Sequence, residues 1–446
     1  MLDEGNKRLM KASSSNGEYL EHFAVCLLLF VALSTATCEA STTSTSFDVL
    51  GYGAVGDGKT DDSSAFLEAW RATCESPSKL SILDVPAKKT FLLKPVTFSG
   101  PCQPDYVYVL FLNFTRPKVS GNIAASSSKT EYSGLPINSW LVFSNVDGLM
   151  VTGTGIIDGR GSGWWSQSCI GNASNDATCK GPTPTYFDFY DACANVVQAL
   201  TFYRCKRLVL NGLRHVNSPR THITLSSCKF ATISNTHISA PATSPNTDGI
   251  DISDSTLVQV RDSFIGTGDD CIAVSGGSSH INVTRITCGP GHGISIGSLG
   301  AHGENDTVEN VIVQNCTLKG TMTGVRIKTW QGGLGYARNI SFNKIRFIRV
   351  DNPIIIDQYY CPTKVDCQNK TSGIRVSDIS YSAIYGTSVT DKVINLSCDQ
   401  NFGCSNIVLD HVYIKSTVPK TKAYPYCFNA HGRYSHTKPA VTCLLE

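Results

Sequence analysis

The chain has 446 residues, a formal net charge of +2 and a charged fraction of 17%. Its hydrophobic fraction of 41% argues against a largely disordered chain, and its near-neutral charge argues against general binding of nucleic acids or other polyanions. An acidic ligand would have to be met by a few local cations.

The first predicted element is an apolar segment at residues 23–37, FAVCLLLFVALSTAT, which is too short to span a bilayer comfortably. Small residues follow at Cys38 and Ala40, as at a signal-peptidase site. We expect residues 1–40 to be a secretion signal with an extended N-terminal region. Translation from Met10 and retention as a membrane anchor remain alternatives. Residues 41–446 are expected to form a single domain without stable membrane association after cleavage.

Cysteine usage agrees with export, because removing Cys26 and Cys38 from the 18 cysteines leaves an even number for an oxidising compartment. Spacing suggests six disulfides: Cys169–Cys179, Cys361–Cys367, Cys398–Cys404, Cys74–Cys102, Cys271–Cys288 and Cys427–Cys443. Sequons for N-glycosylation occur at Asn113, Asn172, Asn282, Asn305, Asn315, Asn339, Asn369 and Asn395. Together they predict a secreted, disulfide-bonded glycoprotein.

One helix is expected near the start of the predicted domain, in TDDSSAFLEAW. Thr60 or Asp61 is the candidate N-cap, and the apolar side chains of residues 65, 66, 69 and 70 fall on one face. Helical periodicity fades after this point. The helix is expected to cap the first coil of a repeating β-rich region.

Short β-rich runs then recur, at LVLNGLRHVNSP, ATISNTHISAP, VQVRDSFIGTG and INVTRITCGPG. Their polar positions Asn211, Asn235, Asp262 and Arg285 are separated by 24, 27 and 23 residues. Periods in the twenties indicate stacked repeats that bury their apolar faces against each other. Leucine spacing and helical returns are lacking, so the pattern predicts an all-β fold, a parallel β-helix that begins near residue 47.

The repeat also aligns polar residues. Asp248 in SPNTDGI, Asp270 in GTGDDCI and His292 in GPGHGISIGS are spaced by 22 residues each, so one coil of that length would stack them. Asp269 adjoins this column, and Arg326 and Lys328 in RIKTW would face one side of a later strand. Flanking glycines remove bulk and admit tight turns.

These groups match the needs of glycosidic cleavage of an acidic sugar, in which one carboxyl protonates the leaving oxygen and another activates water. Cations would hold the sugar carboxylate. Each motif alone fits a solvated turn, a calcium ligand or an exposed strand face, and only their alignment favours a site. GISIG at residues 293–297 resembles a serine-hydrolase elbow, but the strand-like context argues against Ser295 as a nucleophile.

The four blocks SPNTDGI, GTGDDCIAV, CGPGHGISIGSLG and RIKTWQGG resemble, in order and spacing, the signatures of the polygalacturonases of glycoside hydrolase family 28. YGAVGDGKTDDSSAFLEAW and PIIIDQYYC extend the resemblance, which is greatest to the plant branch. It implies a right-handed parallel β-helix that hydrolyses α-1,4 galacturonosyl bonds in pectin with inversion and without metal or cofactor. Residues 183–200 depart from the family pattern, which bears on substrate preference.

The resemblance also implies roles for individual residues. Asp269 would donate the proton, Asp248 and Asp270 would hold and activate water, and His292 would tune the aspartates. Arg326 and Lys328 would bind the substrate carboxylate, Tyr360 would contact the sugar, and Asn246 would shape the site. Adjacent coils place carboxylates roughly 5 Å apart, whereas inverting enzymes need roughly 6.5–9.5 Å.

The expected partner is pectic polysaccharide in the cell wall, and the expected state is a monomer. A calcium-dependent pectate lyase and a catalytically silent wall-binding protein are the alternatives. Endo against exo attack, and preference for homogalacturonan, xylogalacturonan or rhamnogalacturonan, stay open at this point.

Overall fold

A computed structural model describes residues 44–111, 120–132, 139–165, 197–362, 367 and 370–446. Residues 43–446 form one compact unit. The expected signal peptide, the Cys169–Cys179 pair, most of the segment 183–200 and the sequons at Asn113, Asn172 and Asn369 lie outside the described residues.

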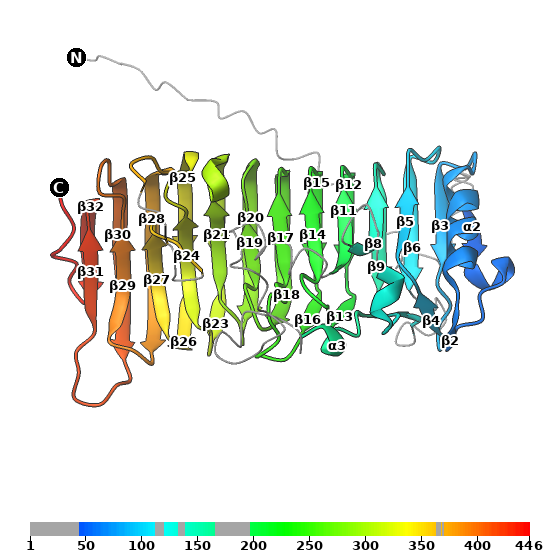
Figure 1. The fold of residues 1–446 in the computed structure, drawn as a ribbon, viewed down its shortest axis with the longest axis horizontal. Coiled ribbons are helices and arrows are strands. Elements are labelled where there is room, and N and C mark those ends of the chain that lie inside the picture. The colour runs from blue at the N-terminus through cyan, green and yellow to red at the C-terminus, as the bar shows by residue number, and fades with distance from the viewer. Residues whose placement is uncertain (1–43, 112–119, 133–138, 166–196, 363–366, 368–369) are drawn as a thin grey trace, which may run out of the picture. The chain divides into compact units, whose positions relative to one another are not determined.

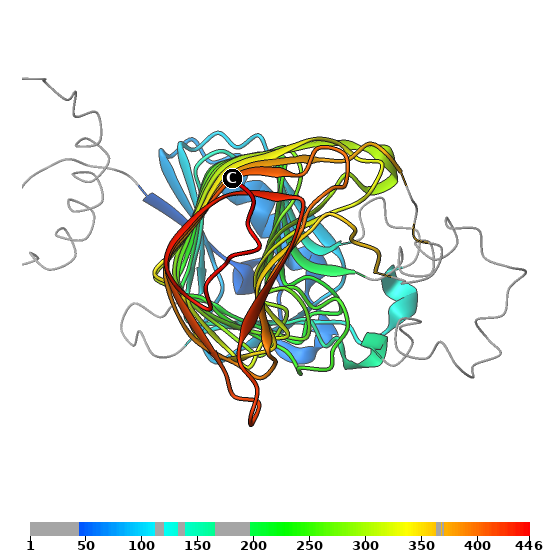
Figure 2. The same ribbon diagram turned by 90° about the vertical axis from the view of Figure 1, so that its left-hand side faces the viewer.

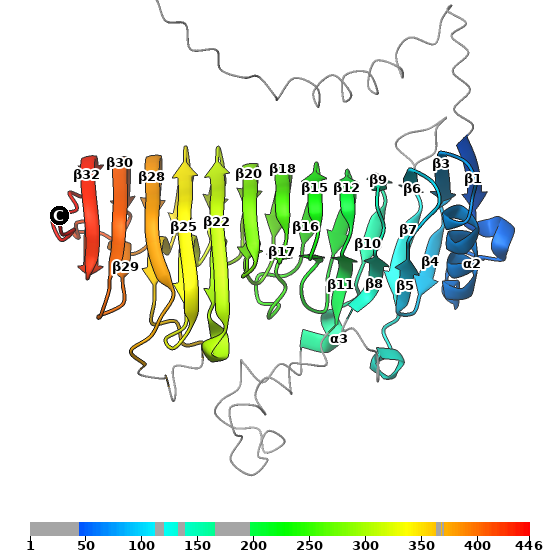
Figure 3. The same ribbon diagram turned by 90° about the horizontal axis from the view of Figure 1, so that it is seen from above.

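The described strands pair in parallel and wind around a common core as a right-handed parallel β-helix. Successive coils lie side by side from α2 (Ser63–Cys74) to β31 and β32 (Figure 1). Viewed from the C-terminal end, the sheets enclose the interior (Figure 2), and the strands of the larger sheet follow one another in chain order (Figure 3). The predicted fold class is confirmed.

The smaller sheet has eleven described strands, which are β5 (Val96–Ser99), β8 (Ser139–Ser144), β11 (Gln198–Tyr203), β14 (Ile223–Ser226), β17 (Ile250–Ser253), β19 (Ile272–Val274), β21 (Ile294–Leu299), β24 (Thr323–Thr329), β27 (Asn352–Asp357), β29 (Lys392–Ser397) and β31 (Tyr424–Phe428). The larger has 21 described strands, which are β1 (Ser44–Asp48), β2 (Asp57–Asp61), β3 (Leu80–Asp84), β4 (Thr90–Leu93), β6 (Tyr106–Phe111), β7 (Asn122–Ala125), β9 (Leu149–Gly153), β10 (Ile156–Asp158), β12 (Lys206–Asn211), β13 (Arg214–Val216), β15 (Lys229–Ser234), β16 (His237–Ser239), β18 (Thr256–Gly266), β20 (Ser278–Cys288), β22 (Asn305–Gln314), β23 (Thr317–Lys319), β25 (Leu334–Asn343), β26 (Arg346–Val350), β28 (Arg375–Ser388), β30 (Cys404–Ser416) and β32 (Ala430–Lys438). Short helices are α3 (Ser162–Trp165), η1 (Val49–Tyr52), η2 (Lys129–Tyr132) and η4 (Ala301–Gly303).

The core is a stack of like side chains, because each strand of the smaller sheet alternates one residue inward and one outward. Ile250, Ile272 and Ile294 pair in register on β17, β19 and β21, and all three are fully buried. Near the first coils, the rings of Phe98, Phe143 and Phe202 stack with centroids 4.8 and 5.6 Å apart. The residues between the inward positions therefore face outward, away from this core.

Helix α2 packs its apolar face on the first coil, as predicted, with residues 65, 66, 69 and 70 buried. The predicted N-cap, Thr60 or Asp61, is wrong: the helix begins after Asp62, whose side chain makes no capping bond. The Asp62 carboxylate instead accepts the backbone N–H groups of Val55 and Gly56, at 2.7 and 3.2 Å. The position of the Asp62 side chain is therefore determined by its bonds to the loop at residues 55–56 and not by capping of the helix.

Three of the four repeated polar positions mark a left-handed turn in the larger sheet, whereas in the coil of Asn211 the left-handed residue is the next one, Gly212. Asn235, Asp262 and Arg285 each have a φ of 54°, a conformation that asparagine and aspartate tolerate better than most residues. Side chains at this position meet those of the next coil, as in the Asp262–Arg285 ion pair at 2.6 Å. The position continues through later coils to His411 and His436, with φ of 54° and 50°.

Five of the six predicted disulfides are present: Cys74–Cys102, Cys271–Cys288, Cys361–Cys367, Cys398–Cys404 and Cys427–Cys443. The even cysteine count does not mean complete pairing, because Cys205, Cys228 and Cys316 are free and buried. Their burial is typical of free cysteines, which pack in protein cores as small apolar side chains. Among the described residues, no helix is long and apolar enough to cross a membrane.

Candidate active site

Asp248, Asp270 and His292 occupy equivalent positions in three successive coils, two residues before β17, β19 and β21. Strand β19 pairs in register with both neighbours, and the Gly249 N–H donates to the Asp270 carbonyl at 2.9 Å. Their backbones are therefore stacked at the spacing of adjacent strands, about 4.8 Å. A 22-residue interval corresponds to one coil in this part of the chain.

The Asp270 carboxylate is the centre of a buried ion network, with only 1% of its side chain exposed. Its Oδ1 accepts from the Ser295 hydroxyl at 2.9 Å and from Arg326 Nη2 at 2.7 Å, while its Oδ2 accepts from Lys328 Nζ at 2.8 Å. Arg326 Nε also donates to Ser295 Oγ at 3.0 Å. Two cations around one carboxylate make strong charge-assisted hydrogen bonds.

Asp269 points to a different set of partners, although it adjoins Asp270. Its Oδ1 accepts from His292 Nδ1 and from the Asp270 backbone N–H, each at 2.8 Å, and its Oδ2 lies 3.4 Å from Asn246 Nδ2. Burial raises the pKa of Asp269, but the hydrogen bond and charge of His292, with the Lys328 charge and the backbone bond, bring this pKa below its ordinary value. Asp269 is therefore ionised in the free protein.

Asp248 has the opposite electrostatic environment. Burial raises the pKa of Asp248 well above its ordinary value, and the negative charges of Asp251, Asp269 and Asp270 add to the increase. The positive charge of Lys328 lowers the pKa of Asp248, but by less than the other effects raise it. The two carboxyl groups Asp248 and Asp269 thus differ in their preferred protonation state, a separation typical of acid–base sites.

The two cations of β24 are nearly buried, with 11% of the Arg326 side chain and 10% of the Lys328 side chain exposed. Arg326 has five N–H donors and Lys328 three, more than their bonds to Asp270 and Ser295 use. Lys328 Nζ also lies 5.3 Å from the centre of the Tyr360 ring. The structure thus brings together all eight predicted site residues. The two cations, which were predicted to bind a substrate carboxylate, bind the carboxylate of Asp270 in the free protein.

Ser295 connects this network, a role that the sequence did not suggest. In register, Ala273, Ser295 and Arg326 follow one another on the outward face of the smaller sheet. The Ser295 side chain lies on strand β21 between Asp270 and Arg326 and is fully buried. The signal was the repeat itself, because Ser295 follows His292 by three residues and lies on strand β21, which begins two residues after His292.

Asp251 is a fourth carboxylate that sequence reasoning missed, three residues after Asp248. Its Oδ2 accepts from the Thr221 hydroxyl at 2.8 Å, whereas its Oδ1 is buried with no partner among the described residues. Burial raises the pKa of Asp251 to about 6. It adds negative charge beside Asp248 and so contributes to the raised pKa there.

The glycines of the site serve close packing between coils. A Cβ atom on Gly268 would lie 1.9 Å from the Ser244 carbonyl oxygen, and one on Gly293, where φ is +81°, would lie 2.1 Å from the Gly324 carbonyl oxygen. Other side chains would push the coils apart at these positions. The disulfide Cys271–Cys288 closes the same coil directly after Asp270.

Asp269, Asp270 and His292 also bring potential metal-ligand atoms within 4.8 Å of one another. Both Asp270 oxygens, however, already bind cationic side chains. A divalent ion would have to compete with the fixed charges of Arg326 and Lys328, so this group does not favour a metal.

Replacing Asp248 by asparagine is expected to make the protein more stable than the wild type at neutral pH. The folded pKa of Asp248 lies above the unfolded value, so its contribution is full below the unfolded pKa and is lost as pH rises through the folded pKa. Asparagine lacks this penalty. Thermal unfolding at pH 4 to 8 should show a variant-minus-wild-type difference that grows with pH; a difference independent of pH would contradict the raised pKa.

The chain is similar in sequence to known proteins over most of its length. The profile of glycosyl hydrolases family 28 matches residues 74–437. The chain is 42% identical over 419 residues to a probable polygalacturonase of Arabidopsis thaliana, covering 93% of this chain and 84% of that protein. It is 39% identical over 398 residues to polygalacturonase-2 of Solanum lycopersicum, covering 89% and 81%.

Solved structures share the fold at lower identity. The endo-xylogalacturonan hydrolase of Aspergillus tubingensis superposes with a TM-score of 0.70 at 24% identity, covering 87% of this chain and 96% of that one. The exopolygalacturonase of Thermotoga maritima does so with a TM-score of 0.67 at 20% identity, covering 83% and 87%. The β-helix is therefore common to proteins with end-wise and internal modes of attack.

Proposed function

The chain belongs to the glycosyl hydrolases of family 28, and from that premise we propose that it hydrolyses α-1,4 galacturonosyl linkages of pectic polysaccharide. The observation that carries the proposal is a cluster of three carboxyl groups beside two nearly buried cations, in which the pKa of Asp248 is raised and the pKa of Asp269 is lowered. Hydrolysis of a glycosidic bond needs one acid and one base. An acidic sugar additionally needs a positive contact.

Asp269 is proposed to protonate the leaving oxygen, with Asp248 and Asp270 holding and activating the water that attacks the anomeric carbon. In the free protein Asp269 is ionised and Asp248 favours its proton. A bound polyanion adds negative charge and excludes water, and both effects raise the pKa of a nearby carboxyl. Substrate binding would therefore shift a proton of this coupled group towards Asp269.

His292 is proposed to tune this proton balance, because its Nδ1 shares a hydrogen bond with Asp269. The hydrogen bond and charge of His292 lower the pKa of Asp269, so a change in this contact would change the proton affinity of Asp269. Asn246, 3.4 Å from the other oxygen of Asp269, would orient the carboxyl group. Both residues act on the acid rather than on the water.

Arg326 and Lys328 are proposed to bind the substrate carboxylate with the donors that Asp270 leaves unused. Their few exposed atoms lie on the outward face of the sheet, and Tyr360 beside Lys328 would contact the sugar ring. The buried Asp270 then has two tasks. It fixes both cations in place, and it supplies negative charge near the attacking water.

Product analysis of polygalacturonate digestion tests the proposal. A hydrolase releases saturated products whose first anomer is inverted, as proton NMR detects during the initial minutes. Unsaturated, ultraviolet-absorbing products that vanish with a chelator would replace the hydrolase by a lyase, and first products of retained configuration would overturn inversion. Chromatography of the same early samples distinguishes monomers, from end-wise attack, from mixed oligomers.

Secretion to the cell wall as a monomer, after removal of residues 1–40, completes the proposal. Five disulfides support an oxidising compartment. The sequons at Asn305, Asn315 and Asn339 are exposed, as acceptors of N-glycans need to be. Residues 41–446 would then act as a single catalytic domain.

A further inference from the structure

A second group of polar side chains lies at the C-terminal end of the β-helix, on β30 and β32, several coils from the site described above (Figure 1). Asp410 pairs in register with Ser435, and Val412 pairs with Thr437. The left-handed residues between them, His411 and His436, therefore occupy the same position in successive coils.

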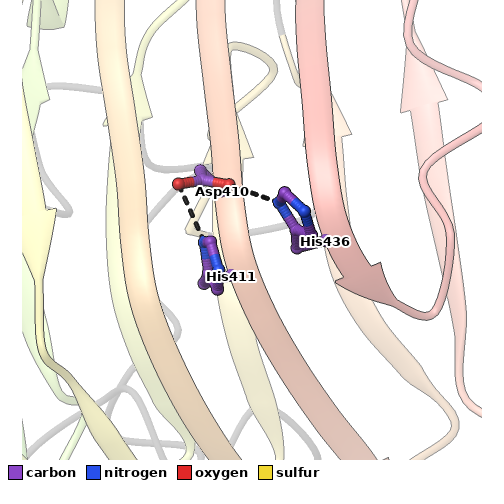
Figure 4. A group of neighbouring side chains, drawn as sticks. All are labelled: Asp410, His411 and His436. Atoms are coloured by element: carbon purple, nitrogen blue, oxygen red, sulfur yellow. Dashed lines mark hydrogen bonds and ion pairs between the residues drawn. The ribbon is translucent and has the colours of Figure 1, made fainter.

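The three side chains Asp410, His411 and His436 converge (Figure 4). His411 Nδ1 lies 2.9 Å from Asp410 Oδ2, and His436 Nδ1 lies 3.3 Å from Asp410 Oδ1. The two imidazole rings stack with centroids 4.4 Å apart and planes inclined by 23°. Each residue offers one ligand atom, and these atoms all lie within 4.8 Å of one another.

The charge of this group suits a cation. Among the described residues, the ion pairs of Asp410 are with these two histidines alone, and the remaining contact is the Ser435 hydroxyl at 2.6 Å. No arginine or lysine of the described part of the chain forms an ion pair with this carboxylate, in contrast to Asp270. Imidazole binds a metal ion in its neutral form, so the carboxylate of Asp410 would supply the one negative charge of the donor set. The side chains of His411 and His436 are 47% and 65% exposed, so an ion can reach them.

We propose that Asp410, His411 and His436 bind a divalent transition-metal ion, with zinc as the natural probe. Two imidazole nitrogens and one carboxylate oxygen are a zinc-type donor set that leaves a position for water. Calcium and magnesium prefer oxygen ligands throughout, so they are not expected to bind here. In a tetrahedral zinc site with bonds of about 2.0–2.2 Å, the ligand atoms lie about 3.4 Å apart. The three ligand atoms, all within 4.8 Å of one another, therefore need to move by about 1 Å to reach one ion.

Such an ion would cross-link the last two coils of the larger sheet. Strand β32 pairs with β30 and, beyond a single bridge from His431 to Leu445, with no other described strand. The ion would therefore fasten an edge strand at the end of the solenoid, where a neighbouring coil is missing on one side. It has no part in the proposed hydrolysis, and its test does not depend on activity.

Calorimetric titration of the chelator-treated full-length protein with zinc chloride tests the site. Wild type should bind one zinc ion, and His436→Asn and His411→Asn should each weaken binding by more than about tenfold, the loss typical of a removed supporting group. Asparagine suits the left-handed backbone at both positions. His280→Asn is the matched control, because His280 is also exposed in a left-handed turn, and it should bind as the wild type does.

Thermal unfolding supplies a second readout, because a ligand that binds only the folded state raises its unfolding temperature. Zinc should raise this temperature for wild type and His280→Asn but not for His436→Asn, and magnesium should do so for none. Absence of zinc binding by wild type, or equal binding by His436→Asn, would overturn the site. Binding that persists in His436→Asn but disappears in Asp269→Asn would place the ion at the other cluster and would equally overturn it.

Discussion

Replacing Asp269 by asparagine is expected to abolish release of reducing ends from polygalacturonate while the protein still folds. Asparagine has nearly the same shape, and its side-chain oxygen can still accept the Asp270 N–H and the His292 hydrogen bond. It cannot deliver a proton. Loss of a positioned general acid lowers rates by about 10²–10⁴-fold, which would leave only traces of activity.

The matched control is Asp262→Asn, in the same stretch of chain. Asp262 lies on the other sheet, and it pairs with Arg285 at the surface. The control variant should therefore keep near-wild-type turnover. Reducing-end assays and circular dichroism on both variants decide the matter, and near-full activity of a folded Asp269→Asn would remove this residue from the role of proton donor.

Replacing Asp270 by asparagine is expected to impair both stability and activity, because it leaves two nearly buried cations with a neutral partner. Breaking a buried ion pair by removal of one charge typically costs about 3–5 kcal/mol. Arg326 and Lys328 would also repel each other without the carboxylate between them. Urea unfolding of wild type and variant measures the loss.

A second substitution separates charge from shape. Lys328→Met added to Asp270→Asn removes one of the two uncompensated cations, so the double variant should recover stability relative to Asp270→Asn alone. Lys328→Met in the wild-type background should instead destabilise. If the two substitutions were simply additive, the buried network would not be the coupled unit that the geometry indicates.

The fold could be predicted from the sequence because a solenoid repeats its signals. Inward residues such as Ile250 and Ile272 recur with each coil, and left-handed turns recur at Asn235 and Asp262. The local sequence pattern could not predict where α2 begins, because the partners of the Asp62 side chain are backbone groups on an earlier loop. Local propensity contains no information about such a closure.

The spacing predicts that the residues of the candidate site lie together, but it does not predict how their side chains pair. A sequence shows that Arg326 and Lys328 face one way, yet it does not show that Asp270 turns towards them while Asp269 turns towards His292. These choices depend on side-chain rotamers and burial. Asp251 was missed for a related reason, because a carboxylate on a strand resembles a solvated residue until its burial is known.

The register of the smaller sheet has a consequence for redesign. Ala273, Ser295, Arg326, Ile355 and Asn395 succeed one another in register, although the intervals between them are 22, 31, 29 and 40 residues. The additional residues of the longer intervals therefore lie in the connections between these strands. They do not change which residue occupies the next outward position. Segments could be grafted into these connections to change what reaches the outward face of the smaller sheet, while the residues of that face keep their order.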